Sequence, residues 1–95
     1  METNNSGRKR RDQLGIMNEI LEITKEPTRK TNIMHGANLS FKQLNKYLNR
    51  LLETGLLEKY YNPHELYRRT EKAKNFLLYY HNLTLLSQYR KDSRT

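Results

Sequence analysis

The chain has 95 residues, of which 35% are hydrophobic, so it forms one small domain whose modest core would gain stability from an added helix or a second copy. Eighteen lysines and arginines against ten acidic residues give a net charge of +8, which favours a polyanionic partner such as nucleic acid or an acidic membrane surface. The absence of cysteine excludes disulfides and thiolate metal sites, and no apolar run reaches the roughly 20 residues of a membrane-spanning helix.

The N-terminal segment METNNSGRKRR is polar and is not followed by an apolar run, so we expect no signal peptide and a soluble, cytoplasmic protein. Residues 1–10 are expected to form a disordered basic tail. The cluster that begins at Arg8 is either a solubilising tail or an arm that contacts a polyanion, and the sequence leaves both alternatives open.

Residues 12–25 are predicted to form the first helix, because apolar side chains recur there at helical spacing. Pro27 closes this segment, since the residue before a proline is biased out of the helical region. Thr28 is then a candidate N-cap of a second helix that runs to about His35. The Gly-Ala-Asn sequence of residues 36–38 supplies a tight turn.

Residues 40–54 carry the clearest helix signals of the chain. Ser40 followed by Gln43 fits a capping box, in which a side-chain oxygen and a side-chain amide exchange hydrogen bonds with the free backbone N–H groups of the first turn. Leucines then repeat at helical spacing along one face. Gly55 is the residue expected to follow the helix in a left-handed conformation.

Residues 56–69 predict a β-hairpin, because two runs rich in aliphatic and aromatic residues flank the turn sequence Asn62-Pro63-His64. Thr70 is a candidate N-cap for the long helical segment that follows without internal glycine or proline.

The last helix is predicted over residues 71–91, and residues 92–95 are expected to be a disordered tail. Its apolar stripe is too wide to be covered by one small domain, which predicts a partner helix in a homodimer. The residues predicted to form this dimer interface are Phe76, Leu77, Tyr80, Leu83 and Leu86.

The predicted element order is that of a winged helix-turn-helix. It consists of three helices, a hairpin and a long final helix, and a tight turn joins the second and third helices. The predicted fold class is therefore mainly α (α+β). The winged helix-turn-helix domain is predicted over residues 11–70, with residues 56–69 as a two-stranded β-wing and residues 71–91 as a C-terminal dimerisation helix.

The sequence also resembles a particular family. The segment KTNIMHGANLS at residues 30–40, Tyr47, the ETGLL of residues 53–57 and the Tyr-x-x-Thr-x-Lys of residues 67–72 are similar to small archaeal winged-helix DNA-binding proteins. In that family the C-terminal helix pairs into an antiparallel coiled coil. The resemblance covers about residues 11–89 and implies a homodimer that binds double-stranded DNA.

Two positions depart from the pattern of many winged helices. Arg69 stands where many have an apolar residue, which leaves open how the second wing strand faces the core. Ala73 stands where many have glycine, and this change is mild because alanine is the better helix former.

The polar side chains of residues 40–54 are candidates for DNA contact, because the N-terminal half of such a helix enters the major groove. An ordinary solvated helix face is the alternative. Gln43 is assigned first to the cap and second to base contact, since it cannot do both at once. The predicted DNA-contacting residues are Arg29, Lys30, Ser40, Lys42, Gln43, Asn45, Lys46, Asn49, Arg50, Lys59 and Arg68.

The sequence contains no pattern that predicts catalysis, a metal site or a cofactor site: the three histidines lack metal-ligand spacing, and there is no glycine-rich phosphate loop. We predict a nucleoid-associated, non-enzymatic homodimer that binds double-stranded DNA, as a transcriptional regulator or a chromatin protein, without a membrane. The alternative is a protein-interaction adaptor of the transcription machinery, with the basic winged-helix face docking an acidic partner. RNA binding is less favoured because no aromatic platform for stacking bases is evident.

Overall fold

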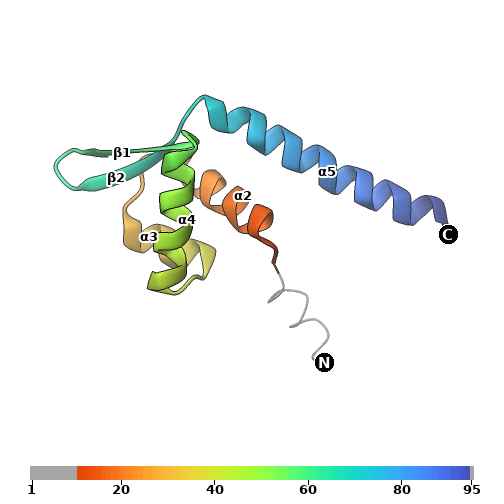
Figure 1. Ribbon diagram of the computed structural model, residues 1–95, viewed down its shortest axis with the longest axis horizontal. Helices are drawn as coiled ribbons and strands as arrows, with labels where there is room; N and C mark the ends of the chain where they lie inside the picture. Colours follow the sequence, from red (N-terminus) through yellow and green to blue (C-terminus); the bar gives the residue numbers. More distant parts are fainter. Residues whose placement is uncertain (1–10, 95) are drawn as a thin grey trace.

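The computed structural model of the chain describes residues 11–94, and their side chains as far as residue 87. The elements, in order, are α2 (Gln13–Ile23), α3 (Lys30–Ala37), α4 (Phe41–Glu53), β1 (Leu57–Tyr61), β2 (Glu65–Arg69) and α5 (Lys72–Arg94) (Figure 1). This arrangement confirms the predicted fold class, mainly α with a small β-hairpin. The predicted N-terminal tail, residues 1–10, lies outside the described residues.

Side-chain hydrogen bonds fix both ends of α2. The Asp12 carboxylate accepts a hydrogen bond from the Gly15 N–H at 2.8 Å, which caps the first turn. At the other end, the fully buried Thr24 donates its hydroxyl to the carbonyl of Ile20 at 2.8 Å. The helix therefore ends shortly before residue 25, the predicted end, and Pro27 lies in the loop beyond it.

Thr28 does not cap α3, which corrects the sequence prediction. Its backbone N–H and C=O both pair with Tyr67 of β2, each at 2.9 Å, and form an isolated antiparallel bridge. The N-cap of α3 is Arg29, whose side chain makes no capping hydrogen bond. The backbone of Thr28 thus fastens the loop between α2 and α3 to the hairpin.

The turn between α3 and α4 is shorter than predicted, because Gly36 and Ala37 belong to α3 and only Asn38 adopts a left-handed conformation, with φ 55°. The N–H of Leu39 donates to the carbonyl of Met34 at 3.0 Å, which closes the last helical turn. A Cβ on Gly36 would lie 3.0 Å from the side chain of Ile23, so glycine allows α3 to approach α2 closely.

The capping box of α4 is confirmed. The Ser40 hydroxyl accepts a hydrogen bond from the Gln43 N–H at 3.1 Å, and the Gln43 Oε1 accepts one from the Ser40 N–H at 3.0 Å. Gly55 follows the helix with φ 79°, as predicted. One face of the helix is buried against α2, α3 and the hairpin, through Leu44, Tyr47, Leu48 and Leu51.

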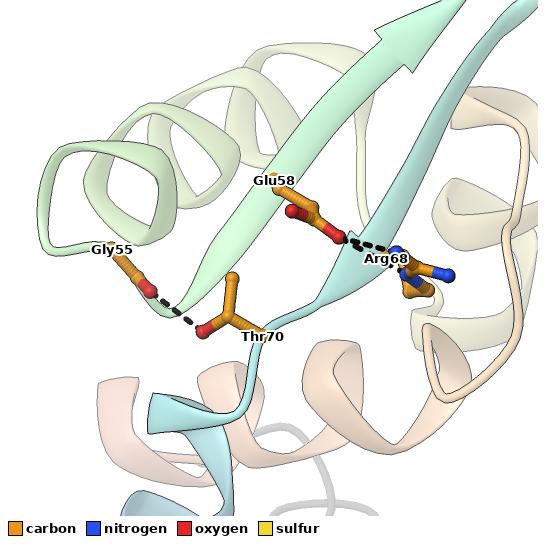
Figure 2. A network of polar contacts seen from close by, with 4 residues as sticks. All are labelled: Gly55, Glu58, Arg68 and Thr70. Atoms are coloured by element: carbon orange, nitrogen blue, oxygen red, sulfur yellow. Dashed lines mark hydrogen bonds and ion pairs between the residues drawn. The ribbon is translucent and has the colours of Figure 1, made fainter.

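The strands β1 and β2 pair antiparallel in a register that runs from Leu57 opposite Arg69 to Tyr61 opposite Glu65, which confirms the hairpin. Thr70 is not the cap of α5, because its hydroxyl donates to the carbonyl of Gly55 at 2.7 Å (Figure 2). The hairpin is thereby closed at the end nearest α4.

The helix α5 contacts α2 and then extends beyond the other helices, on the side opposite the hairpin (Figure 1). The Cα radius of gyration of 15.0 Å exceeds the roughly 12 Å expected for a compact domain of this length. The helix runs to Arg94, beyond its predicted end at residue 91, because no glycine or proline interrupts it; the tail predicted at 92–95 is therefore helical through Arg94. No helix of the described residues is both long and apolar enough to span a membrane.

A buried tyrosine organises the charged groups of the hairpin. Tyr67, which is 3% exposed, donates its hydroxyl to the carboxylate of Glu65. This hydrogen bond is the main cause that holds the pKa of Glu65 below its ordinary value, and the positive charges of Lys59 and Lys30 act in the same direction. Burial and the hydrogen bond to Glu65 raise the pKa of Tyr67.

We expect Ser40→Ala to lower the free energy of unfolding by about 1 kcal/mol, because the N–H of Gln43 loses its acceptor. The matched control is Ser87→Ala, at an exposed position on α5. Urea unfolding followed by circular dichroism measures both changes. Equal stability of the two variants would contradict a structural role for the cap.

The pH dependence of stability should report on Glu65. Because its folded-state pKa is lowered, its stabilising contribution is present above the ordinary value of 4.5 and is lost as the pH falls through the folded-state pKa. Glu65→Gln should therefore lose less stability than the wild type on acidification below pH 4.5, measured by urea unfolding at several pH values. Glu22→Gln, an exposed substitution on α2, should follow the wild type. Identical pH profiles for wild type and Glu65→Gln would refute this role.

Candidate nucleic-acid interface

The helix α4 presents a polar ridge on the side opposite its buried face. At 100° per residue, Lys42, Lys46 and Asn49 lie opposite Leu44 and Leu51. All three ridge side chains are exposed, whereas the two leucines are fully buried. We call these three residues the outer ridge. Because the buried face and the two capped ends hold the helix in place, the outer ridge is presented on a fixed support.

The cations around α3 and α4 form no ion pair with another side chain of the described residues. Residues 27–52 contain five lysines and arginines and no acidic residue. The ion pairs among the described residues lie elsewhere, on α2, on the hairpin and at the start of α5. Unpaired cations of this kind favour a polyanionic ligand on this side of the molecule. These cations are Arg29, Lys30, Lys42, Lys46 and Arg50.

Two of the predicted contact residues on α4 lie to the sides of the outer ridge. The guanidinium of Arg50 donates to the side-chain oxygen of Gln13 on α2, at 2.8 Å, so it is directed toward α2. Asn45 is half-buried on the other flank. The sequence pattern grouped Arg50 with the outward residues, and it could not show the partner on α2 because Gln13 is 37 residues away.

The capping residues Ser40 and Gln43 lie at the leading end of α4. The sequence predicts that Gln43 serves the cap before base contact, and its Oε1 accepts a hydrogen bond from the N–H of Ser40 at 3.0 Å. The Ser40 hydroxyl is likewise engaged with the first turn. Both side chains are exposed, but their hydrogen bonds to the backbone define the start of the helix.

The start of α3 carries a contact that the sequence pattern does not indicate. The Lys30 ammonium lies 4.8 Å from the centre of the Phe41 ring, at the first residue of α4. Phe41 is 60% exposed. The sequence gives no signal for this exposure, because Phe41 lies three and seven residues before the buried Leu44 and Leu48 and so shares their helical spacing. Arg29, beside Lys30, is exposed.

The two cations predicted on the wing are both engaged by glutamates across the hairpin. Lys59 lies 3.6 Å from Glu65, and Arg68 donates two hydrogen bonds, at 2.8 and 3.0 Å, to Glu58 (Figure 2). The guanidinium of Arg68 also lies 5.5 Å from the Tyr60 ring centre. Exposed ion pairs of this kind contribute about 0–1 kcal/mol, so a phosphate could replace either glutamate at small cost.

Arg69 anchors the wing to the end of α2. Its guanidinium donates to the carbonyl of Leu21 at 3.3 Å, and its N–H donates to the carbonyl of Thr24 at 3.0 Å. A cation is favourable there, because the last carbonyls of a helix lack partners and carry partial negative charge. This contact explains how an arginine occupies a position where many winged helices have an apolar residue. Ala73, the second departure, is fully buried.

A second anchor joins α4 to α5. The ammonium of Lys72, the first residue of α5, donates to the carbonyl of Thr54 at 2.9 Å, and the hydroxyl of Thr70 binds the carbonyl of Gly55 (Figure 2). These contacts supply donors to carbonyls at the C-terminal end of α4. The direction of α5 is thereby fixed relative to the outer ridge.

The side chains predicted to form a dimer interface divide into two groups. Phe76 and Leu77 are half-buried against the core, and the Tyr80 hydroxyl lies beside Gly15, where a Cβ would approach it to 3.0 Å. Leu83 and Leu86 are 37% and 58% exposed. The exposed apolar surface of α5 also includes residues that the prediction omitted, namely Leu78, Tyr79 and Leu85.

The described residues contain no group of three or more histidine, aspartate or glutamate side chains arranged to hold a metal ion. The surface just described consists of exposed cations, amides and one aromatic ring. Such groups bind by charge, hydrogen bonding and apolar contact.

Comparison with solved structures finds the same fold in proteins of low sequence identity. Sso10a-2, a DNA-binding protein from Sulfolobus solfataricus, superposes with a TM-score of 0.79 at 24% identity, over 88% of this chain and 90% of that chain. A variant of ZitR from Lactococcus lactis, in its apo form, gives a TM-score of 0.60 at 19% identity, over 98% of this chain and 76% of that chain.

The sequence comparisons agree with the fold. An uncharacterized protein of the archaeon Methanocaldococcus jannaschii is 38% identical over 64 residues, which are 66% of this chain and 66% of that protein. A family model described as winged helix-turn-helix matches residues 10–88, a range that includes α2, α3, α4 and the hairpin. With the family model covering most of its length and its elements in the corresponding order, the chain belongs to the winged helix-turn-helix family.

Proposed function

We propose that this protein binds double-stranded DNA, with α4 in the major groove and the β1–β2 hairpin beside the sugar-phosphate backbone. The observation that carries the proposal is the outer ridge: Lys42, Lys46 and Asn49 are exposed on a helix capped at both ends. No acidic side chain among the described residues forms an ion pair with either lysine. That Sso10a-2, with the same fold, is a DNA-binding protein supports the proposal.

The physical basis is counterion release. Each lysine or arginine that neutralises a phosphate releases condensed cations from the duplex, and this contributes affinity without reading the sequence. Lys42 and Lys46 on the outer ridge, with Arg29 and Lys30 at the start of α3, supply these contacts. Asn45 and Asn49 add polar groups that can hydrogen-bond to base edges or phosphates.

The biological role that fits this surface is that of a transcriptional regulator or a chromatin-associated protein. Lysines and arginines dominate the residues around α4, and such contacts mainly position a protein on the duplex. The balance between phosphate contacts and base contacts decides between the two roles. Mapping where the protein sits along a genome separates them, since a regulator gives discrete sites and a chromatin protein gives broad coverage.

We expect Lys46→Ala to weaken binding to duplex DNA and to make it less sensitive to salt. Removing one phosphate contact should reduce the slope of log K against log salt concentration by about 0.9. Fluorescence anisotropy with a random-sequence duplex at several salt concentrations measures both quantities. The matched control is Lys74→Ala, because Lys74 is an exposed lysine on α5 that pairs with Glu71 at 3.2 Å.

The same titration distinguishes DNA binding from the adaptor function. If Lys46→Ala leaves both the affinity and the salt slope unchanged, Lys46 does not contact the DNA. No binding of the wild type to duplex DNA even at low salt would refute the proposal and favour an adaptor whose basic face docks an acidic protein.

We further propose that the protein acts as a homodimer joined through α5. Phe76, Tyr79, Leu83 and Leu86 follow the alternating three- and four-residue spacing of a coiled coil. Phe76 is half-buried against the core, whereas Tyr79, Leu83 and Leu86 are 60%, 37% and 58% exposed, so the stripe beyond Phe76 faces water in a single copy. Pairing two such helices would bury it, and it would place two α4 helices in one particle that engages two half-sites.

Leu86→Glu should therefore produce monomers, because it places a charge within the apolar stripe. Loss of the second binding module should also lower the affinity for duplex DNA by about 10²-fold or more. The control is His81→Glu, which adds a negative charge at an exposed position about 140° away around the helix. Sedimentation equilibrium determines the oligomeric state, and an unaltered dimer in Leu86→Glu would contradict this interface.

A further inference from the structure

One aromatic ring lies exposed at the leading end of α4. Phe41 is the first residue of the helix, directly after the Ser40 cap, and 60% of it is exposed. Outside α5, the other large apolar side chains exposed among the described residues are Leu14 on α2 and Tyr61 on the hairpin. Phe41 is therefore the exposed apolar side chain of the helix-turn-helix unit.

Phe41 points in nearly the same direction around α4 as the buried Leu48, but it lies at the first residue of the helix, where its ring stays exposed. The buried face of the helix is centred on residues 44, 47, 48 and 51, and Phe41 lies about 70° from that centre. It shares the flank of Asn45, one turn further along, which adjoins the outer ridge. The ring therefore lies at the border between the buried face and the polar surface of the helix, and 60% of the residue is exposed there.

Lys30 constrains this ring. Its ammonium lies 4.8 Å from the ring centre, within the range of a cation–π interaction, and it reaches Phe41 from the first residue of α3. The ring therefore stands next to a cation that is itself placed to meet phosphate. An aromatic group held in this way loses less conformational freedom when it binds.

The chemistry of the major groove supplies one apolar partner for such a ring. The edges of the base pairs present hydrogen-bond donors and acceptors, with a single exception, the C5-methyl group of thymine. Phenylalanine is among the side chains that contact this methyl group. The side-chain oxygen of Gln43 is engaged in the cap. At the leading end of α4, the apolar ring of Phe41 is therefore free to contact bases, whereas the Gln43 oxygen is not.

We propose that Phe41 is a specificity-determining residue that contacts the C5-methyl group of thymine in the major groove. This inference rests on the proposed binding of double-stranded DNA. The lysines and arginines contact phosphates, and these contacts do not depend on the base. Burial of the thymine methyl group against Phe41 does depend on the base, so this contact would let the protein prefer thymine.

The test compares two random-sequence duplex pools that differ only in carrying thymine or uracil. Uracil pairs with adenine in the same way but lacks the C5-methyl group, so the phosphate charge is unchanged. We expect the wild type to bind the thymine pool about fourfold more tightly for each methyl group that is contacted. Competition titrations followed by fluorescence anisotropy measure this ratio.

Phe41→Ala should bind both pools equally. The matched control is Tyr61→Ala, which removes another exposed aromatic side chain, 68% exposed on the hairpin, and should keep the wild-type ratio. Circular dichroism and thermal unfolding check that Phe41→Ala is folded, as expected for an exposed side chain. The ratio of the two affinities is read within one variant, so a general change in stability does not alter it.

The outcomes separate this inference from the proposed function. No binding of the wild type to either pool refutes DNA binding and this inference together. Equal binding of the wild type to both pools, or a thymine preference that Phe41→Ala retains, overturns the role of Phe41 and leaves DNA binding standing. Loss of the preference in Tyr61→Ala as well as in Phe41→Ala overturns the assignment to Phe41 in particular.

Discussion

The position of α4 is the constraint on which the rest of the structure depends, and reciprocal hydrogen bonds between Ser40 and Gln43 decide where this helix begins. A start displaced by one residue would rotate the side chains by 100° and would move lysines toward the core. The fully buried Leu44 and Leu51 hold the same rotation from the opposite face. The cap and the buried leucines therefore favour the same rotation of the helix. In that rotation Lys42 and the other residues of the outer ridge face the solvent.

Hydrogen bonds to backbone atoms connect the remaining elements to this helix. Thr28 pairs with the backbone of β2, and Arg69 binds carbonyls at the end of α2. Thr70 and Lys72 bind the carbonyls of the residues that follow α4. The chain has 95 residues and a small core, so apolar burial alone would leave the directions of the hairpin and of α5 loosely determined. These hydrogen bonds fix both directions. The outer ridge, the wing and α5 are consequently held in one arrangement.

The charges are organised by element. On the hairpin, Glu58 and Glu65 compensate the nearby cations, whereas residues 27–52 contain no acidic residue at all. The unpaired cations among the described residues thus cluster around α3 and α4, beside the capped start of α4. Under the proposed function, this distribution would orient DNA toward α4 and leave the wing an auxiliary role. Phe41 adds an apolar element at the edge of the same surface, and we assign base preference to it because the cations contact phosphate whatever the sequence.

The sequence by itself determined the order of the elements, the caps of α4, the left-handed Gly55, the hairpin and the outer ridge. Each of these rests on interactions between residues a few positions apart, whose signals are visible in a short stretch of sequence. Only the tertiary structure decided which polar groups joined distant elements. Thr28 has the properties of a helix cap, yet its backbone pairs with β2, and Arg50 turns to a partner 37 residues away. The tertiary structure also decided which apolar residues of α5 are buried and that Phe41 is exposed. Burial depends on how the helices pack against one another and cannot be read from the local pattern alone.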